Sequence, residues 1–239
     1  MADYFSKILK LLLLLFCLAL IFYLWDFLKN YSDQLILLTY QHLRMVLFAM
    51  PPAIALGVGL GILIHRSERR AAIVVGIAGV IMTVPSIALF GLMIPFLAPL
   101  GAGVGLVPSI IALILYSQLP IIRNTYVGLR EISPAVLKAA EGMGLTKWEV
   151  LRKVRLPLAL PVLLSGIRTA VVLSVGVAAV AAYIGGGGLG RWIFGGIRRT
   201  YPEMMLSGAV AVSLLAIGLD MALARFQKLL SRGNLKLET

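Results

Sequence analysis

The chain has few charged residues, because only 13% of its 239 residues are Asp, Glu, Lys or Arg. A water-soluble surface needs more charge than this, which argues against one or two soluble domains. Acidic residues are the scarcer kind, with 10 against 22 basic residues and a formal net charge of +12. The basic residues lie mostly between long apolar runs rather than on one polar face. That distribution favours a cytoplasmic membrane face and argues against a nucleic-acid partner.

Several chemistries lack the residues that they need. Cys17 is the only cysteine, which excludes an intrachain disulfide and a zinc site built from cysteines. His42 and His65 are the only histidines and lack the spacing of metal ligands or of a catalytic triad. No G-x-x-x-x-G-K-[ST] motif is present to hold ATP. We therefore expect no catalytic residue, no metal and no cofactor on this chain.

Long apolar runs dominate the sequence, in which 60% of the residues are hydrophobic and the mean hydropathy is +0.98. A helix needs about 20 mostly apolar residues to cross the hydrocarbon core. Six runs reach or nearly reach that length: residues 8–25, 45–64, 71–94, 104–122, 158–183 and 204–224. They are continuous and lack the alternation of a barrel strand. The sequence thus predicts an all-α integral membrane protein with six transmembrane helices.

The positions of Lys and Arg predict the orientation of these spans. With the amino terminus inside, 17 of the 22 basic residues fall on the cytoplasmic side, and those outside are Lys29, Arg44, Arg191, Arg198 and Arg199. Both termini are then cytoplasmic. The first run follows Lys7 and Lys10 as a signal peptide does, but no small-residue cleavage site follows it. A retained signal anchor is therefore favoured over a cleaved leader.

Residues 123–157 form the only long polar stretch. Ser133 and Pro134 suit the start of a helix, and Gly144 suits its end. Thr146 then predicts the cap of a second short helix, with Glu149 completing a capping box. Apolar residues fall at helical spacing on both helices, at Val136, Leu137, Ala139, Ala140, Met143, Trp148, Val150, Leu151 and Val154. This pattern predicts a cytoplasmic helical hairpin that either docks a partner or lies along the lipid headgroups.

Within this stretch, KAAEGMGLTKWEVLRKVRLP (138–157) resembles the signature loop of ABC importer permeases. The matches to the family pattern are Ala139, Ala140, Gly144, Val154, Leu156 and Pro157, and the coupling loop would also include Glu141 and Gly142. Lys138 departs from the pattern, because the family usually has Glu at that position. The ion pair which that Glu would make is therefore not expected here.

The resemblance implies a type I ABC importer permease fold with a five-helix core, in which this loop carries the coupling helix. It implies partners as well: two ATP-binding subunits that hold ATP and Mg, a second permease copy or a similar permease subunit, an extracytoplasmic solute-binding protein, and membrane lipid. The expected location is the bacterial cytoplasmic (inner) membrane. The corresponding division is an N-terminal signal-anchor helix with a short extracytoplasmic segment (1–40), the permease domain (41–225, coupling loop about 123–157) and a cytoplasmic tail (226–239).

A narrower resemblance comes from residues 83–95, 108–129 and 155–170, which look like the osmoprotectant-uptake branch of this superfamily. It implies a compatible solute such as glycine betaine, choline or carnitine. One alternative is an ABC permease for an amino acid or another small polar solute. A different class is an ion-coupled secondary transporter, which predicts internal repeats and acidic residues near mid-membrane. A structural membrane-assembly protein without transport is a third class.

Polar residues inside the spans are candidates for lining a translocation path. Pro85 should kink the third span and free a carbonyl, and Ser86 follows it. Tyr116, Ser117, Gln118 and Pro120 complete the set. The alternative for all of them is ordinary hydrogen bonding between helices.

Three other features have competing interpretations. The glycine-rich segment 185–190 lacks the βαβ context of a dinucleotide site, so it is an extracytoplasmic turn or a flexible part of an outer gate. The small residues at Gly57–Gly61 suit close packing in a dimer core. Asp220 is the one acidic residue inside a span, and we expect it to snorkel or to pair locally, with Arg225 as the candidate partner, rather than relay protons.

Overall fold

The structure is a computed structural model that describes residues 22–235 together with Leu15 and Ala19. The predicted first span, residues 8–25, therefore lies largely outside the described residues, as do residues 236–239. Within the described part every regular element is a helix and there is no strand. This confirms the predicted all-α fold.

The described chain begins with helical residues 22–30 and a turn at Tyr31. The elements after it are α2 (Ser32–Ile64), α3 (Glu68–Thr83), α4 (Ser86–Leu97), the short helix η1 (Ala98–Leu100), α5 (Leu106–Arg130), α6 (Pro134–Gly142), α7 (Lys147–Glu149), the π-helix η2 (Val150–Arg155), α8 (Leu156–Ala178), the 3₁₀-helix η3 (Val180–Ile184), α9 (Gly190–Arg199) and α10 (Pro202–Leu235). Helix α5 continues to Arg130, so the first residues of the polar stretch 123–157 belong to a span rather than to a loop.

Four helical segments are long and apolar enough to cross a membrane: Ser32–Ile64, Leu106–Arg130, Lys147–Ala178 and Pro202–Leu229. They correspond to four of the predicted spans. The predicted third span, residues 71–94, is instead the pair α3 and α4, bent by 99°. The described residues thus supply up to five spans. A sixth would have to come from the first apolar run.

The bend in the third span has a local cause at Pro85. Proline has no N–H and disfavours helical backbone in the residue before it, and Val84 is indeed extended, with φ −63° and ψ 128°. The carbonyl of Val84 accepts a hydrogen bond from the Tyr116 hydroxyl of α5. The bend of 99° at this point confirms the kink predicted at Pro85.

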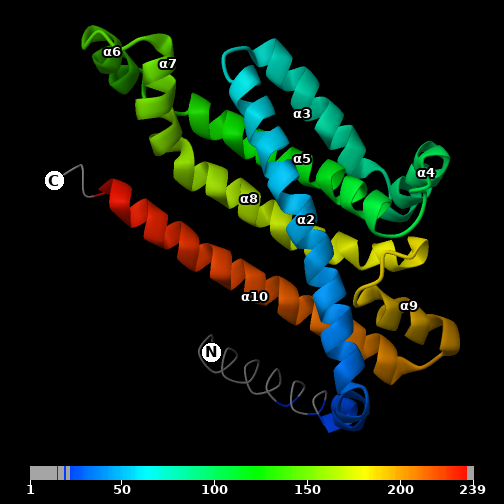
Figure 1. Ribbon diagram of the computed structural model, residues 1–239. Helices are drawn as coiled ribbons and strands as arrows, with labels where there is room; N and C mark the ends of the chain where they lie inside the picture. Colours follow the sequence, from blue (N-terminus) through cyan, green and yellow to red (C-terminus); the bar gives the residue numbers. More distant parts are fainter. Residues whose placement is uncertain (1–14, 16–18, 20–21, 236–239) are drawn as a thin grey trace, which may run out of the picture.

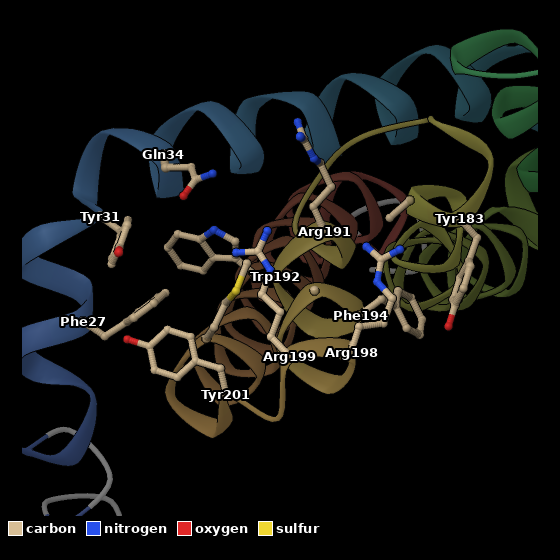
Figure 2. A pocket seen from close by; sticks show the side chains of 13 residues that line it. Phe27, Tyr31, Gln34, Tyr183, Arg191, Trp192, Phe194, Arg198, Arg199 and Tyr201 are labelled. Carbon is tan, nitrogen blue, oxygen red and sulfur yellow. The ribbon is translucent and has the colours of Figure 1, made fainter.

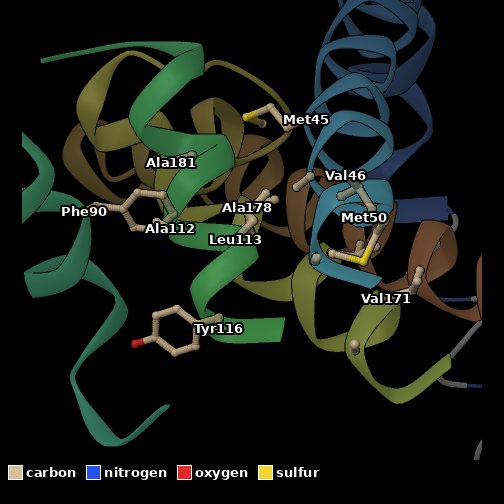
Figure 3. Close-up of a cluster of buried hydrophobic side chains, with 14 of the residues drawn as sticks. Met45, Val46, Met50, Phe90, Ala112, Leu113, Tyr116, Val171, Ala178 and Ala181 are labelled. Carbon is tan, nitrogen blue, oxygen red and sulfur yellow. The ribbon is translucent and has the colours of Figure 1, made fainter. Parts of the chain in front are cut away.

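Helix α5 forms the centre of the bundle, because it packs against α2, α3 and α8, while α10 lies along α8 (Figure 1). The largest buried cluster joins α2, α4, α5 and α8 and includes Met45, Phe90 and Leu113, each fully or almost fully buried (Figure 3). Gly57 and Gly61 also face α5: a Cβ atom on Gly57 would lie 2.6 Å from Ile121. These two glycines therefore serve contact between helices of one chain.

The two ends of the bundle carry different elements. The hairpin of α6 and α7 projects from one end, whereas α4 and α9 lie at the other (Figure 1). Helix α7, η2 and α8 follow one another without a break and form one helical segment of 32 residues, Lys147–Ala178. The hairpin is thus directly continuous with a span.

Candidate functional site

The first helix of the hairpin, α6, has the predicted boundaries. Ser133 occupies the N-cap position and Pro134 the first turn, although the Ser133 side chain makes no capping hydrogen bond. At the other end the Gly144 N–H donates to the Glu141 carbonyl (2.9 Å), and the Leu145 N–H donates to the Ala140 carbonyl (3.3 Å). Gly144 has φ +80°. This is the Schellman arrangement that ends a helix on a left-handed glycine, as the sequence predicted.

The second helix starts with the predicted capping box. The Glu149 N–H donates to the Thr146 hydroxyl oxygen, and the Thr146 N–H donates to the Glu149 carboxylate (3.0 Å). Lys153 adds an ion pair to Glu149 at 2.9 Å. The hydrogen bond from Lys153, followed by those from Thr146, lowers the pKa of the Glu149 carboxyl to about 2. The carboxylate is therefore ionised at any physiological pH.

The base of the hairpin is fixed to the spans by buried contacts. Ala140, Val150 and Leu151 are buried, and Leu151 packs in a cluster with Leu129. The Arg155 guanidinium donates to the Leu129 carbonyl of α5 (2.8 Å). These contacts hold the hairpin rigidly at the junction of α5 and α8.

The hairpin also exposes large apolar side chains, and two of them, Met143 and Trp148, lie at or beside the turn between α6 and α7. Val136 is 42% exposed, Met143 74% and Trp148 65%. Of the residues predicted for the coupling loop, Ala140 is buried, Val154, Leu156 and Pro157 are half-buried, and Ala139, Glu141, Gly142 and Gly144 are exposed. The hairpin thus combines an anchored base with exposed apolar side chains.

The candidates for the translocation path on α5, Pro120 included, are buried inside the subunit. The Tyr116 hydroxyl bonds to the backbone at the α3–α4 break, and Ser117 hydrogen-bonds to Ser174 of α8 at 2.9 Å. The Gln118 amide donates to the Ala53 carbonyl of α2 at 3.4 Å, and to the Ile114 carbonyl of its own helix at 2.8 Å. These bonds are what the alternative of interhelical hydrogen bonding predicted.

The glycine-rich segment 185–190 is closely packed. The Gly188 N–H donates to the Gln41 side chain of α2 at 3.1 Å. A Cβ atom on Gly186 would meet the Ser109 hydroxyl at 2.4 Å, and one on Gly190 would lie 1.8 Å from the Ala179 carbonyl oxygen. The segment is therefore a tight joint between α2, α5 and the end of α8, which favours the turn over a flexible gate.

Asp220 has a different partner from the predicted Arg225. The Arg168 guanidinium of α8 binds the Asp220 carboxylate of α10 in a bidentate pair, with the second contact at 2.6 Å. Arg168 lies within α8, inside the predicted span 158–183. A guanidinium thus neutralises the Asp220 carboxylate, as expected, but it is not the guanidinium of Arg225.

Sequence analysis missed helix α9, which lies in a region interpreted as an extracytoplasmic connection. Its buried residues include Gly190, Trp192 and Gly195, whereas Arg198 and Arg199 are exposed. The spacing of Trp192, Gly195 and Gly196 along one helical face is the signal that could have revealed it.

Comparisons with known proteins agree with this architecture. A family model described as a binding-protein-dependent transport system inner membrane component matches residues 53–236. The osmoprotectant import permease protein OsmW of Salmonella typhimurium is 48% identical over 194 residues, which cover 81% of this chain and 90% of that protein. The choline transport system permease protein OpuBB of Bacillus subtilis is 40% identical over 211 residues, covering 88% and 95%.

Among solved structures, an inward-facing form of the MetNI methionine ABC transporter matches with a TM-score of 0.76. At 24% identity, over 84% of this chain and 98% of that chain, it supports the fold alone. The family works with an ATP-hydrolysing subunit and a solute-binding protein, and its members cross the inner membrane several times. The chain belongs to the binding-protein-dependent transport system inner membrane components, as a non-catalytic permease subunit of an ABC importer.

Proposed function

We propose that this permease moves a compatible solute of the glycine betaine, choline or carnitine type across the cytoplasmic membrane. The observation that carries the proposal is the 48% identity to an osmoprotectant import permease along 90% of that protein's length. Relatives named for choline or carnitine transport are 39–41% identical. The amino-acid alternative has weaker support, since the methionine transporter chain is 24% identical.

The hairpin is the proposed docking element for the ATP-hydrolysing subunit. Its exposed apolar side chains, Val136, Met143 and Trp148, offer surface that gains free energy when a partner covers it. The buried contacts at its base keep the hairpin from bending relative to the spans when the ATP-hydrolysing subunit displaces it. Because α7, η2 and α8 are one continuous helical segment, displacement of the tip would be transmitted to α8 as a rigid-body motion.

The proposed assembly contains two ATP-binding subunits, this chain with a second copy or a similar permease, and an extracytoplasmic solute-binding protein. ATP and Mg belong to the ATP-binding subunits. The proposed orientation places the hairpin and both termini in the cytoplasm, in accordance with the distribution of Lys and Arg. Alternating access would then open the path between the two permease subunits. In this proposal Pro85 and Ser86, at the bend between α3 and α4, lie beside that path, with Tyr116, Ser117 and Gln118 behind them.

Replacement of Gly144 tests the coupling role of the hairpin. A Cβ atom at Gly144 meets nothing within 4 Å, so Gly144→Val acts only through its left-handed backbone, φ +80°. That conformation costs a residue with a side chain about 1–2 kcal/mol, which lowers the equilibrium constant for the native turn about 5- to 30-fold. We expect solute uptake per ATP hydrolysed to fall, by at most that factor, in the reconstituted transporter.

Gly101→Val is the matched control for this variant. Gly101 has φ +69° and equally open surroundings, but it lies near η1 at the opposite end of the bundle. We expect it to leave the ratio of uptake to ATP hydrolysis unchanged. Equal coupling in Gly144→Val and wild type would refute the role of the hairpin.

The solute is tested by uptake into proteoliposomes that contain the permease, its ATP-binding subunits and the solute-binding protein. We expect ATP-dependent accumulation of radiolabelled glycine betaine, choline or carnitine, and none of methionine. Accumulation of methionine alone would support the amino-acid alternative. Uptake driven by an ion gradient without ATP would instead indicate a secondary transporter.

A further inference from the structure

A cavity of about 400 Å³ lies at the end of the bundle opposite the hairpin. It is lined by helical residues 22–30, the start of α2, η3, helix α9 and the start of α10 (Figure 2). Aromatic rings form one part of its wall: Phe27 meets Trp192 edge to face at 5.0 Å between ring centroids, and Tyr201 at 5.6 Å. The other part of the wall is basic.

The charge of the lining is uniformly positive. Arg191, Arg198 and Arg199 all line the cavity, and no Asp or Glu does. None of the three forms an ion pair with another described residue. Figure 2 shows Arg191 and Arg199 on the side of α9 that faces α2. An occupant with net negative charge is therefore favoured, whereas a zwitterionic solute would leave most of this positive charge without a counter-ion.

Trp192 adds a second, independent requirement. Its side chain is completely buried and lines the cavity, yet its Nε1–H has no acceptor among the described residues. A buried N–H without an acceptor costs free energy, and a buried indole N–H usually has a partner. The missing acceptor is thus expected from whatever fills the cavity.

The surface beside the cavity is apolar. Phe22 is 86% exposed and Trp25 60% on the first described helix, and Ile36 is 69% exposed on α2. In a membrane protein such side chains face acyl chains, and a belt of Tyr and Trp rings marks the level of the headgroups. An acidic protein surface would have to lie over these apolar residues, whereas a lipid would cover them with its own chains.

We propose that the cavity binds the phosphate headgroup of an anionic phospholipid, in the extracytoplasmic leaflet if the hairpin is cytoplasmic. The phosphate oxygens accept hydrogen bonds from the Trp192 indole and from the guanidinium groups of α9. The acyl chains lie along helical residues 22–30 and α2. This inference does not depend on which solute is transported.

Native mass spectrometry of the purified transporter, with phosphatidylglycerol or phosphatidylcholine added after delipidation, tests the proposal. We expect tighter retention of phosphatidylglycerol by the wild type. Arg199→Gln should weaken it about tenfold, as expected for loss of one charge-assisted hydrogen bond. Trp192→Phe, which removes the N–H, should weaken it several-fold. Lys29→Gln, which removes a positive charge at the same end but outside the cavity, should change it less than about twofold.

Two results would overturn the proposal. The first is equal retention of both lipids, or retention of phosphatidylglycerol that neither Arg199→Gln nor Trp192→Phe changes in a protein of unaltered melting temperature. The second is weaker capture of the solute-binding protein by Arg199→Gln in pure phosphatidylcholine nanodiscs, with lipid retention unchanged. That outcome would assign the arginines to protein docking.

Discussion

Replacing Gly190 by alanine tests whether the glycine-rich segment is a rigid joint. The Cβ atom of an alanine at this position would lie 1.8 Å from the Ala179 carbonyl oxygen and 2.6 Å from its carbonyl carbon. Folded proteins essentially never show such contacts below 3.0 Å. Because the atoms in the way are backbone, no side-chain rotation relieves the overlap. Helix α9 or η3 must shift by about 1.2 Å, which disturbs the packing around Trp192.

The expected cost of this shift is at the upper end of the range for overpacking, about 3 kcal/mol. For a chain of this length each kcal/mol lowers the melting temperature by about 2–4 °C, so Gly190→Ala should melt about 6–12 °C below the wild type. Thermal unfolding of the purified protein in detergent, followed by tryptophan fluorescence, measures this directly.

Gly176→Ala is the matched control, because Gly176 is an exposed glycine of α8 with nothing within 4 Å of its Cβ position. That variant should be stabilised by about 0.4–1 kcal/mol through lower entropy of the unfolded chain. The reasoning fails if Gly190→Ala melts within about 2 °C of the wild type. The segment would then be compliant, as a flexible outer gate requires.

Two further predictions concern charged groups. Arg168→Gln and Asp220→Asn should each lower the melting temperature, because each leaves an unpaired charge within a span. The double variant should recover most of the loss. A double variant that is less stable than either single variant would contradict this prediction. Glu149→Gln should lower the melting temperature equally at about pH 5 and pH 8, because the folded-state pKa of Glu149 is about 2, below its ordinary 4.5. The stabilisation by the Glu149 carboxylate is complete above about pH 4.5 and is lost as the pH falls toward 2. If the difference in melting temperature between the wild type and Glu149→Gln changed between pH 5 and pH 8, this assignment of the Glu149 pKa would be wrong.

Sequence analysis was most accurate where the interacting groups are neighbours in the chain. The Thr146 and Glu149 capping box joins residues three positions apart, and the bonds at Gly144 stay within the same short turn. The break at Pro85 follows from the missing N–H of one residue. In each case the backbone geometry depends on residue type alone, so the pattern is sufficient.

Sequence analysis failed where the partner is distant in the chain. Asp220 is 52 residues from Arg168 but only five from Arg225, and proximity in sequence suggested the wrong guanidinium. Gly57 is small because Ile121 approaches it, a contact that no local signal reveals. The pattern that marks small residues as helix interfaces does not say which helix they meet.

The sequence by itself determined that this protein is a helical membrane permease with a capped hairpin between two of its spans, because hydropathy, capping residues and the loop signature act locally. Only the tertiary structure decided that the polar residues of α5 are bonded inside the subunit and that the glycine-rich segment is packed tight. It also decided that the arginines of α9 surround a cavity beside a buried indole. These features depend on which helices lie side by side, and apolar faces in lipid do not encode that choice.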